Sequence, residues 1–285
     1  MLNTNQYLNL GCGDRFNASW TNINFVSTGQ GVIAHNLKQG IPFPDNSFDV
    51  VYHSHVLEHF PKEEAEPFIR ECYRVLRPKG ILRVVVPDLE QIAKMYLHSL
   101  EKASNGSEEW EQNYQWMFLE MYDQTVRNQT GGEMLKFLSQ PDLSNQEFVV
   151  KRCGVEVQNL IPATQNISPS PDSKKVIIKF VKELYRIFRY HNYRRQAILK
   201  LILSPQELDS LKIGQFRQSG EIHQWMYDHY SLSVLLKNCG LEGITRRTAH
   251  ESYIHNWTSF NLDTETDGAI YKPDSLYMEA IKTVS

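Results

Sequence analysis

The stretch Tyr7-Leu-Asn-Leu-Gly-Cys-Gly13 decides the fold. Its first four residues form the kind of short, largely apolar run that makes a buried strand. The two glycines let the backbone turn tightly and bring peptide N–H groups close to a ligand. Only six residues, Asp14 to Ser19, separate this turn from the next predicted strand, and six residues span about 9 Å even when fully helical. We therefore expect the first helix of the usual α/β pattern to be severely shortened.

Short apolar runs alternate with turns up to about residue 90, which is the pattern of an α/β sheet. Helical spacing predicts a helix over 61–76, ended by Arg77-Pro-Lys-Gly80, and another over 231–238 that stops before Gly240. Strands are predicted at 7–10, 20–26, 31–35, 48–53, 81–86, 243–249 and 275–282.

No strand signal occurs for more than 100 residues after Asp88, although sheet elements lie on both sides of this region. It is therefore expected to be an insertion into one domain rather than a second domain. The predicted division is a core of residues 1–90 and 221–285 with a helical insertion, 91–220, that covers the cleft and selects the acceptor.

The composition excludes several classes of protein. The chain has 285 residues, of which 41% are hydrophobic and 22% charged, as in a soluble globular protein. No apolar run approaches the length of a membrane span, and a net charge of -3 makes nucleic acid an unexpected partner. The four cysteines are far apart in the sequence, which predicts reduced thiols, and the N-terminus lacks the features of a secretory signal. A cytoplasmic protein is expected, and the oligomeric state is not indicated.

One segment of the insertion is strongly basic. Between Lys174 and Lys200 there are nine Lys or Arg residues and one acid, Glu183. On a helix, Ile177 and Phe188 would lie on one apolar stripe with the basic residues opposite. Such a helix packs as a surface or lid helix, or it contacts a membrane surface, a lipid-linked substrate or an anionic partner; both interpretations stay open.

The glycine turn suits some cofactors better than others. A dinucleotide fingerprint needs a third glycine where this chain has Phe16, followed by a full helix facing the pyrophosphate. A nicotinamide or flavin coenzyme would therefore lack its phosphate site. S-adenosylmethionine has no phosphate and needs the turn only for its amino-acid end.

Several ordered motifs across residues 7–88 resemble the class I methyltransferases, specifically the type 11 group. They are Leu8-Asn-Leu-Gly-Cys-Gly13, Trp20-Thr-Asn-Ile-Asn24, His35-Asn-Leu37, Ile41-Pro-Phe-Pro-Asp-Asn-Ser-Phe-Asp-Val50, Ser54-His-Val-Leu-Glu-His59 and Arg74-Val-Leu-Arg-Pro-Lys-Gly80. The resemblance implies a Rossmann-like α/β fold with a mostly parallel seven-stranded sheet, the helical insertion lying between strands 5 and 6. It also implies S-adenosylmethionine as the cofactor.

The resemblance assigns cofactor contacts to eight residues: Asn9, Gly11, Cys12, Gly13, Asn24, Asn36, Leu37 and Ser54. Asn24 and Asn36 stand where the family usually has acids. An amide oxygen accepts a hydrogen bond without the gain that a carboxylate charge brings, so affinity is expected to fall by about 1 kcal/mol per site. The alternative role for both asparagines is turn chemistry at strand ends.

Histidines follow the fourth predicted strand. The H-x-H-x-x-E-H spacing of His53, His55, Glu58 and His59 suggests a metal site. These residues straddle a strand end and a helix start, however, and need not converge, so no metal is expected. His55 is predicted to contact cofactor or acceptor, or else to be a structural histidine at a helix entry. Glu58 and His59 are expected to be structural.

A second candidate group lies where the insertion returns to the sheet. His223 is the first choice for a base that faces the acceptor, with Asp228 as its orienting partner or as a second proton acceptor. The alternative for Asp228 is a cap on the helix that follows it.

The predicted function is methyl transfer from S-adenosylmethionine to an oxygen of a small molecule such as a sugar or glycan precursor. His223-Gln-Trp-Met-Tyr-Asp228 and Lys272-Pro-Asp-Ser-Leu-Tyr-Met-Glu-Ala280 look like a subgroup associated with bacterial glycan or natural-product biosynthesis. Two alternatives stay open: carboxyl methyl-esterification of a peptide or natural product, which needs no base, and a catalytically silent protein that docks an anionic partner. A nucleic-acid methyltransferase is disfavoured, because the chain lacks the N/D-P-P-Y/F tetrapeptide of amino-methylating enzymes.

Overall fold

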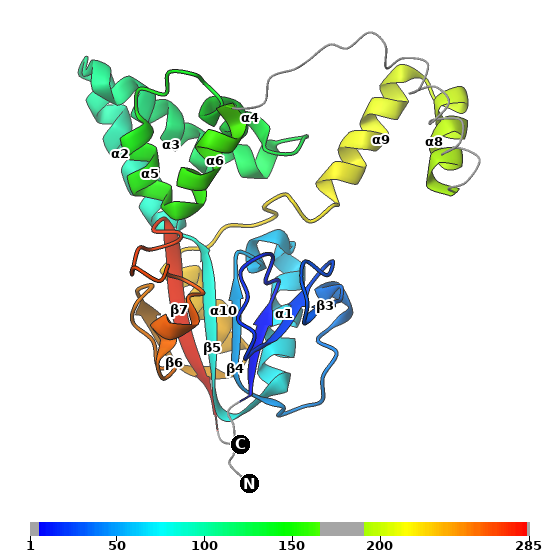
Figure 1. The fold of residues 1–285 in the computed structure, drawn as a ribbon, viewed down its shortest axis with the longest axis vertical. Coiled ribbons are helices and arrows are strands. Elements are labelled where there is room, and N and C mark those ends of the chain that lie inside the picture. The colour runs from blue at the N-terminus through cyan, green and yellow to red at the C-terminus, as the bar shows by residue number, and fades with distance from the viewer. Residues whose placement is uncertain (1–5, 166–190, 284–285) are drawn as a thin grey trace.

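A seven-stranded sheet in the order β3-β2-β1-β4-β5-β7-β6 forms the centre of the computed structural model, which describes residues 6–165 and 191–283 (Figure 1). β1 to β5 pair in parallel, and β7 lies antiparallel between β5 and β6. The strands are β1 Tyr7–Leu10, β2 Thr21–Asn24, β3 Val32–Ala34, β4 Phe48–Ser54, β5 Leu76–Pro87, β6 Leu241–Arg247 and β7 Ser275–Lys282. The predicted Rossmann-like sheet is confirmed. The largest difference between a predicted and an observed strand boundary is at β5, which was predicted to begin at residue 81 and begins at Leu76. The pairing of β5 with β4 has a register shift near its start and is regular after it.

The described helices flank the sheet or belong to the region between β5 and β6. They are α1 Lys62–Val75, α2 Leu89–Ser104, α3 Glu108–Val126, α4 Gly132–Leu138, α5 Gln146–Cys153, α6 Val155–Gln165, α8 His191–Ile202, α9 Pro205–Arg217, α10 His229–Asn238, and the short 3-10 turns η1 Leu37–Gln39, η2 Leu57–His59 and η4 Trp257–Phe260.

Helices α1 and α10 cover one face of the sheet. Phe68 and Ile69 of α1 and Leu232 and Leu236 of α10 are buried in the same apolar cluster as the strand residues. Leu232 and Leu236 are four residues apart, and Phe68 and Ile69 follow the buried Ala65 by three and four residues, so each set lies on one helical face, as the sequence pattern predicted.

The opposite face is covered by a loop instead of a helix. Between Gly11 and Trp20, where all residues are described, the chain makes only turns, so the expected shortening of the first crossover is confirmed. Residues 248–263, including η4, fill the space with Trp257 and Leu262, which pack on Trp20 and Tyr52 of the sheet.

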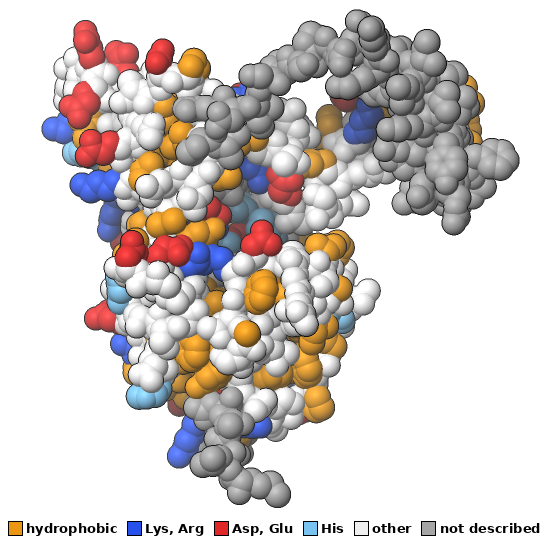
Figure 2. Space-filling view, in the orientation of Figure 1, with side chains coloured by type: hydrophobic (Ala, Val, Ile, Leu, Met, Phe, Trp, Pro, Cys, Tyr) orange, Lys and Arg blue, Asp and Glu red, His pale blue; other side chains and the backbone are white. Residues whose placement is uncertain are grey.

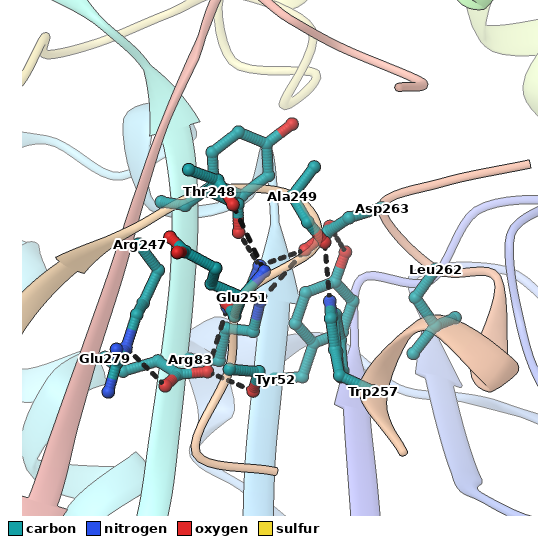
Figure 3. A network of polar contacts seen from close by, with 12 residues as sticks. Tyr52, Arg83, Arg247, Thr248, Ala249, Glu251, Trp257, Leu262, Asp263 and Glu279 are labelled. Atoms are coloured by element: carbon teal, nitrogen blue, oxygen red, sulfur yellow. Dashed lines mark hydrogen bonds and ion pairs between the residues drawn. The ribbon is translucent and has the colours of Figure 1, made fainter. Parts of the chain in front are cut away.

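Buried charges hold this loop in place (Figure 3). The completely buried Arg83 of β5 donates to Asp263 at 2.7 Å, to Glu279 of β7 at 2.8 Å and to the carbonyl of Thr248 at 2.8 Å. Tyr52 of β4 donates to the second oxygen of Asp263 at 2.6 Å. The network therefore joins three central strands to the loop that replaces the missing helix.

Helices α2 to α6 lie beyond the carboxyl ends of the parallel strands and have a separate apolar cluster around Trp116 and Val149 (Figure 1). They are tied to the sheet where α6 begins. The backbone N–H of Glu156 bonds to the carbonyl of Tyr271, and Lys272 Nζ lies 3.0 Å from a Glu156 oxygen. These contacts hold the helices over the strand ends, although the domain boundaries predicted above stay a prediction.

The basic segment is only partly described. Residues 166–190, which contain the predicted amphipathic helix, lie outside the described residues. None of the described helices is long and apolar enough to cross a membrane.

Candidate active site

Three hollows meet at His55, just after the end of β4. The first, of about 310 Å³, contains the glycine turn; the second, of about 410 Å³, contains the ends of β2 and β3. The third, of about 670 Å³, lies between the sheet and the insertion. His55 lines all three. Figure 2 shows the opening below the insertion, with histidine side chains inside it.

The glycine turn forms the floor of the first hollow. Gly11 has a φ of +63°, and a Cβ added to it would lie 2.3 Å from Val56 Cγ2. Only glycine fits this backbone without displacing Val56. Asn9 is buried, and its amide donates to Asn22 and to the carbonyl of Arg15, so that Asn9 stabilises the turn.

The far wall of the first hollow comes from residues that the sequence analysis did not assign. Arg15 donates to the carbonyls of Asn261 and Leu262, and its guanidinium lies 3.8 Å from the centre of the Tyr271 ring. Lys272 lines both the first and the third hollow. The motif that begins at Lys272 was the only sequence signal for this wall.

The second hollow brings together Asn24, Asn36 and Leu37, as the predicted cofactor contacts require. Both asparagines also take part in turns: Asn24 Nδ2 donates to the carbonyl of Val26, and Asn36 Oδ1 accepts from the N–H of Lys38 as the cap of η1. Asn24 Oδ1 and Asn36 Nδ2 are not used in these bonds.

Phe25 was missed, although it directly follows β2. Its side chain is 68% exposed and lines the second hollow beside Leu37. A large exposed aromatic ring at a strand end, lining a concave surface, is an unusual use of phenylalanine in the absence of a ligand.

All eight predicted cofactor residues line the first or the second hollow. Asn9, Gly11, Cys12, Gly13 and Ser54 line the first, and Gly11, Asn24, Asn36 and Leu37 line the second. Gly11 and His55 are common to both, so the two hollows are adjacent.

His55 is held from two sides. Its Nε2 lies 2.9 Å from Ser275 Oγ at the start of β7, and its Nδ1 lies 3.1 Å from a carboxylate oxygen of Glu58. Burial lowers the pKa of His55. A neutral imidazole is thus fixed where the three hollows meet.

Two residues of the predicted histidine motif, Glu58 and His59, lie beside a residue from far along the chain. The segment that returns from the insertion pairs with η2: Gln224 N–H donates to the carbonyl of Glu58, and His59 Nδ1 lies 3.1 Å from the carbonyl of Ile222. His223 consequently lies beside Glu58, with Nε2 4.0 Å from a carboxylate oxygen. Glu58 and His59 therefore meet His223, which lies outside the H-x-H-x-x-E-H motif, because the 3-10 turn puts both on the side of the returning segment.

The predicted pairing of His223 with Asp228 is corrected by the structure. Asp228 caps α10, accepting from the N–H of Ser231 at 2.8 Å in a capping box. Among the described residues, the carboxylate beside His223 belongs to Glu58. His223 itself lines the third hollow, and burial lowers its pKa to about 3.

The third hollow combines an apolar wall with charged groups. Its apolar residues come mainly from the insertion: Ile92, Trp116, Met134, Leu135, Leu138, Val157, Leu160 and Met226. Its charged residues include Glu120, Arg127, Glu156, Glu221, Lys272 and Asp274. A ligand there would meet both a hydrophobic surface and hydrogen-bonding groups.

Comparison with known proteins agrees with this geometry. Residues 16–84 match the model of a family described as a methyltransferase domain. This part of the chain is similar to class I S-adenosylmethionine-dependent methyltransferases, and the strand order of the sheet agrees with their Rossmann-like fold. The cofactor of this family is S-adenosylmethionine.

Individual relatives share short segments or the fold. A probable S-adenosylmethionine-dependent methyltransferase of Mycolicibacterium smegmatis is 43% identical over 56 residues, which cover 20% of this chain and 21% of that protein. The chain thus matches about a fifth of the length of this curated relative.

Two solved methyltransferase structures are also similar. One, from Archaeoglobus fulgidus, is 11% identical with a TM-score of 0.38 and covers 98% of this chain and 87% of its own. A 1,6-didemethyltoxoflavin-N1-methyltransferase of Burkholderia thailandensis, with bound S-adenosylhomocysteine, is 16% identical with a TM-score of 0.25; the match covers 30% of this chain and 45% of that one.

Proposed function

We propose that this protein transfers a methyl group from S-adenosylmethionine to an acceptor bound between the sheet and the insertion. One observation carries the proposal: two hollows lined by all eight predicted cofactor residues meet a third, larger hollow at His55. Open α/β sheets bind their ligands at this edge, outside the carboxyl ends of the strands.

The residues of the first two hollows fit the cofactor. The turn at Gly11 and Gly13 presents backbone to the amino-acid end, and at Gly13 an added Cβ would project into open space. Asn24 Oδ1 is an acceptor for a ribose hydroxyl, and Phe25 offers its exposed face to adenine. When bound, S-adenosylmethionine supplies an electrophilic methyl group.

The protein's contribution to the reaction is alignment and exclusion of water, which supplies about 7–11 kcal/mol in well-oriented reactions. The insertion, fixed through Glu156 and Lys272, covers the junction. His55 contacts the reacting group there, and its two polar neighbours, Glu58 and Ser275, fix the ring.

The acceptor we propose is a hydroxyl group of a small molecule such as a sugar or glycan precursor. The apolar wall of the third hollow favours an acceptor that also carries an apolar portion. A hydrophobic aglycone or lipid on the sugar would satisfy both halves of the lining.

Titration calorimetry and product analysis test the function. The full chain is expected to bind one equivalent of S-adenosylmethionine and to methylate members of a panel of sugars, lipid-linked sugars and peptides, detected by mass spectrometry. Treatment with mild base separates a stable methyl ether from a labile methyl ester. No heat or thermal shift at millimolar cofactor would overturn the proposal and favour a silent protein.

Replacing Phe25 with alanine is expected to weaken cofactor binding without loss of stability. Stacking of a base on an aromatic ring contributes about 1–3 kcal/mol, or roughly 5- to 150-fold in affinity. The ring is 68% exposed, so its removal leaves little cavity. Calorimetry and thermal melting measure the two quantities.

Tyr230 provides the matched control for this change. Its ring is 71% exposed on α10 and lines none of the three hollows. Tyr230→Ala is expected to change neither property. Equal affinities of Phe25→Ala and the unaltered protein would place the nucleoside elsewhere.

A further inference from the structure

The Glu58 carboxylate is buried without a matching counter-charge. Its side chain is completely buried, and neither carboxylate oxygen has a hydrogen-bond partner in good geometry. Among the described residues, Glu58 forms no ion pair with a lysine or arginine; its neighbours at ion-pair distance are the imidazoles of His55 and His223, whose pKa values burial lowers. A buried carboxylate in such surroundings is costly unless it is paired or coordinates a metal.

Two imidazoles face this carboxylate from different parts of the chain. One donor atom each from Glu58, His59 and His223 lie within 4.8 Å of one another. In a tetrahedral zinc site with ligand distances of about 2.0–2.2 Å, donor atoms lie about 3.4 Å apart. A contraction of at most about 1.4 Å by side-chain rotation would therefore close this set around an ion.

The hydrogen bond of His59 leaves its Nε2 available as a ligand atom. Its Nδ1 lies 3.1 Å from the carbonyl oxygen of Ile222, so this nitrogen carries the proton and donates it. The lone pair is consequently on Nε2. Metal-binding histidines usually donate their other ring nitrogen to a carbonyl or carboxylate in this way.

We propose that Glu58, His59 and His223 bind one divalent transition-metal ion of the zinc class. Two imidazoles and one carboxylate suit Zn²⁺, Co²⁺ or Fe²⁺ and are not the all-oxygen set that Mg²⁺ or Ca²⁺ prefers. His55 lies at the edge of the site beside Glu58.

The remaining coordination position faces the acceptor hollow. His59 and His223 both line that hollow, which leaves room for a water molecule or an acceptor oxygen as the next ligand. Bound there, the ion would act as a Lewis acid that orients a hydroxyl group of the acceptor and makes its proton more acidic. This role rests on the proposed function, whereas the binding site itself does not.

Cobalt uptake by the full chain tests the site. The protein is treated with a chelator, desalted and titrated with Co²⁺ in the absence of cofactor, with visible absorption as the readout; calorimetry with Zn²⁺ repeats the titration. One equivalent is expected, with the absorption of a low-coordinate nitrogen–oxygen site. Glu58→Gln and His223→Gln are each expected to weaken binding about 100-fold or more, because even outer partners of metal ligands contribute 10- to 100-fold.

His229→Gln is the matched control. His229 is half-exposed, pairs with Glu90 and lines none of the three hollows, so cobalt affinity is expected to be unchanged. Circular dichroism shows whether each variant folds, and His59→Gln replaces Glu58→Gln if the latter does not. Lack of stoichiometric uptake, or equal uptake by the folded ligand variants, overturns the proposal.

Cofactor calorimetry on the metal-free protein separates the two proposals. Binding of S-adenosylmethionine without cobalt uptake would support the methyltransferase proposal and overturn the metal-site proposal. Cobalt uptake without cofactor binding does the reverse.

Discussion

Replacing Arg83 with methionine is expected to lower the free energy of unfolding by about 3–5 kcal/mol, because it leaves Asp263 and Glu279 as uncompensated buried charges. Burial opposes the charge on Arg83, but the two carboxylates outweigh this effect and raise the pKa of the guanidinium. Methionine fills part of the space and has no donor for the carbonyl of Thr248. Urea unfolding followed by tryptophan fluorescence and circular dichroism measures the loss.

An exposed arginine gives the comparison. Arg70 on α1 pairs with Glu66 in solvent, and Arg70→Met is expected to cost less than about 1 kcal/mol. Adding Asp263→Asn and Glu279→Gln to Arg83→Met is expected to restore part of the stability, since the buried negative charges are then gone. A cost as small as that of Arg70→Met would mean that the carboxylates are solvated and that the network does not hold the 248–263 loop.

Local patterns predicted the sheet well. Two local patterns were sufficient: the apolar runs of β1 and β4, and the helical spacing of Phe68, Ile69 and Cys72 in α1. Each depends only on residues close together in the sequence, so it can be recognised without the three-dimensional structure. No element was predicted between the strands expected at 243–249 and 275–282, where the structure has the loop of residues 248–263. This loop covers one face of the sheet because Arg83, far away in the sequence, bonds to it. A local sequence pattern cannot predict such a long-range contact.

The site was predictable where it follows strand ends. Gly11, Asn24 and Ser54 come after or at the ends of adjacent parallel strands, so their meeting follows from topology. Glu156 and Lys272 lie in the insertion and in the loop before β7, and their positions required the three-dimensional structure.

The proximity of Glu58 and His59 to His223, and the role of Asp228, differ in how far the sequence indicated them. The proximity of Glu58 and His59 to His223 depends on the 3-10 turn η2. Sequence patterns that distinguish strands from helices do not predict such a turn. The role of Asp228 as a helix cap could be predicted from the sequence, because Ser231 follows it by three residues, which is the spacing of a capping box.

Replacing Gly11 with alanine is expected to weaken S-adenosylmethionine binding by about 100-fold, equivalent to about 2.7 kcal/mol. An L-residue at a φ of +63° costs about 1–2 kcal/mol, and the new Cβ would lie 2.3 Å from Val56 Cγ2. Overpacking of this kind typically costs a further 1–3 kcal/mol, and relief of the contact must move the turn or Val56, which lines the second hollow. Calorimetry with the cofactor and urea unfolding measure the two effects.

Two further variants separate strain from steric overlap. Gly13 also has a positive φ, of +52°, but an added Cβ meets no protein atom within 4 Å, so the effect of Gly13→Ala on urea unfolding reports backbone strain alone. Val56→Ala removes the methyl group that the Gly11→Ala side chain would strike, and the double variant is therefore expected to recover the steric part of the loss in a double-mutant cycle. A coupling energy of about zero for cofactor binding, or equal losses of stability for Gly11→Ala and Gly13→Ala, would show that the approach of Val56 to the glycine turn does not shape the cofactor site. Substantial coupling would instead tie the turn after β1 to the residue that follows His55, and so link the cofactor hollows to the histidine at their junction with the acceptor.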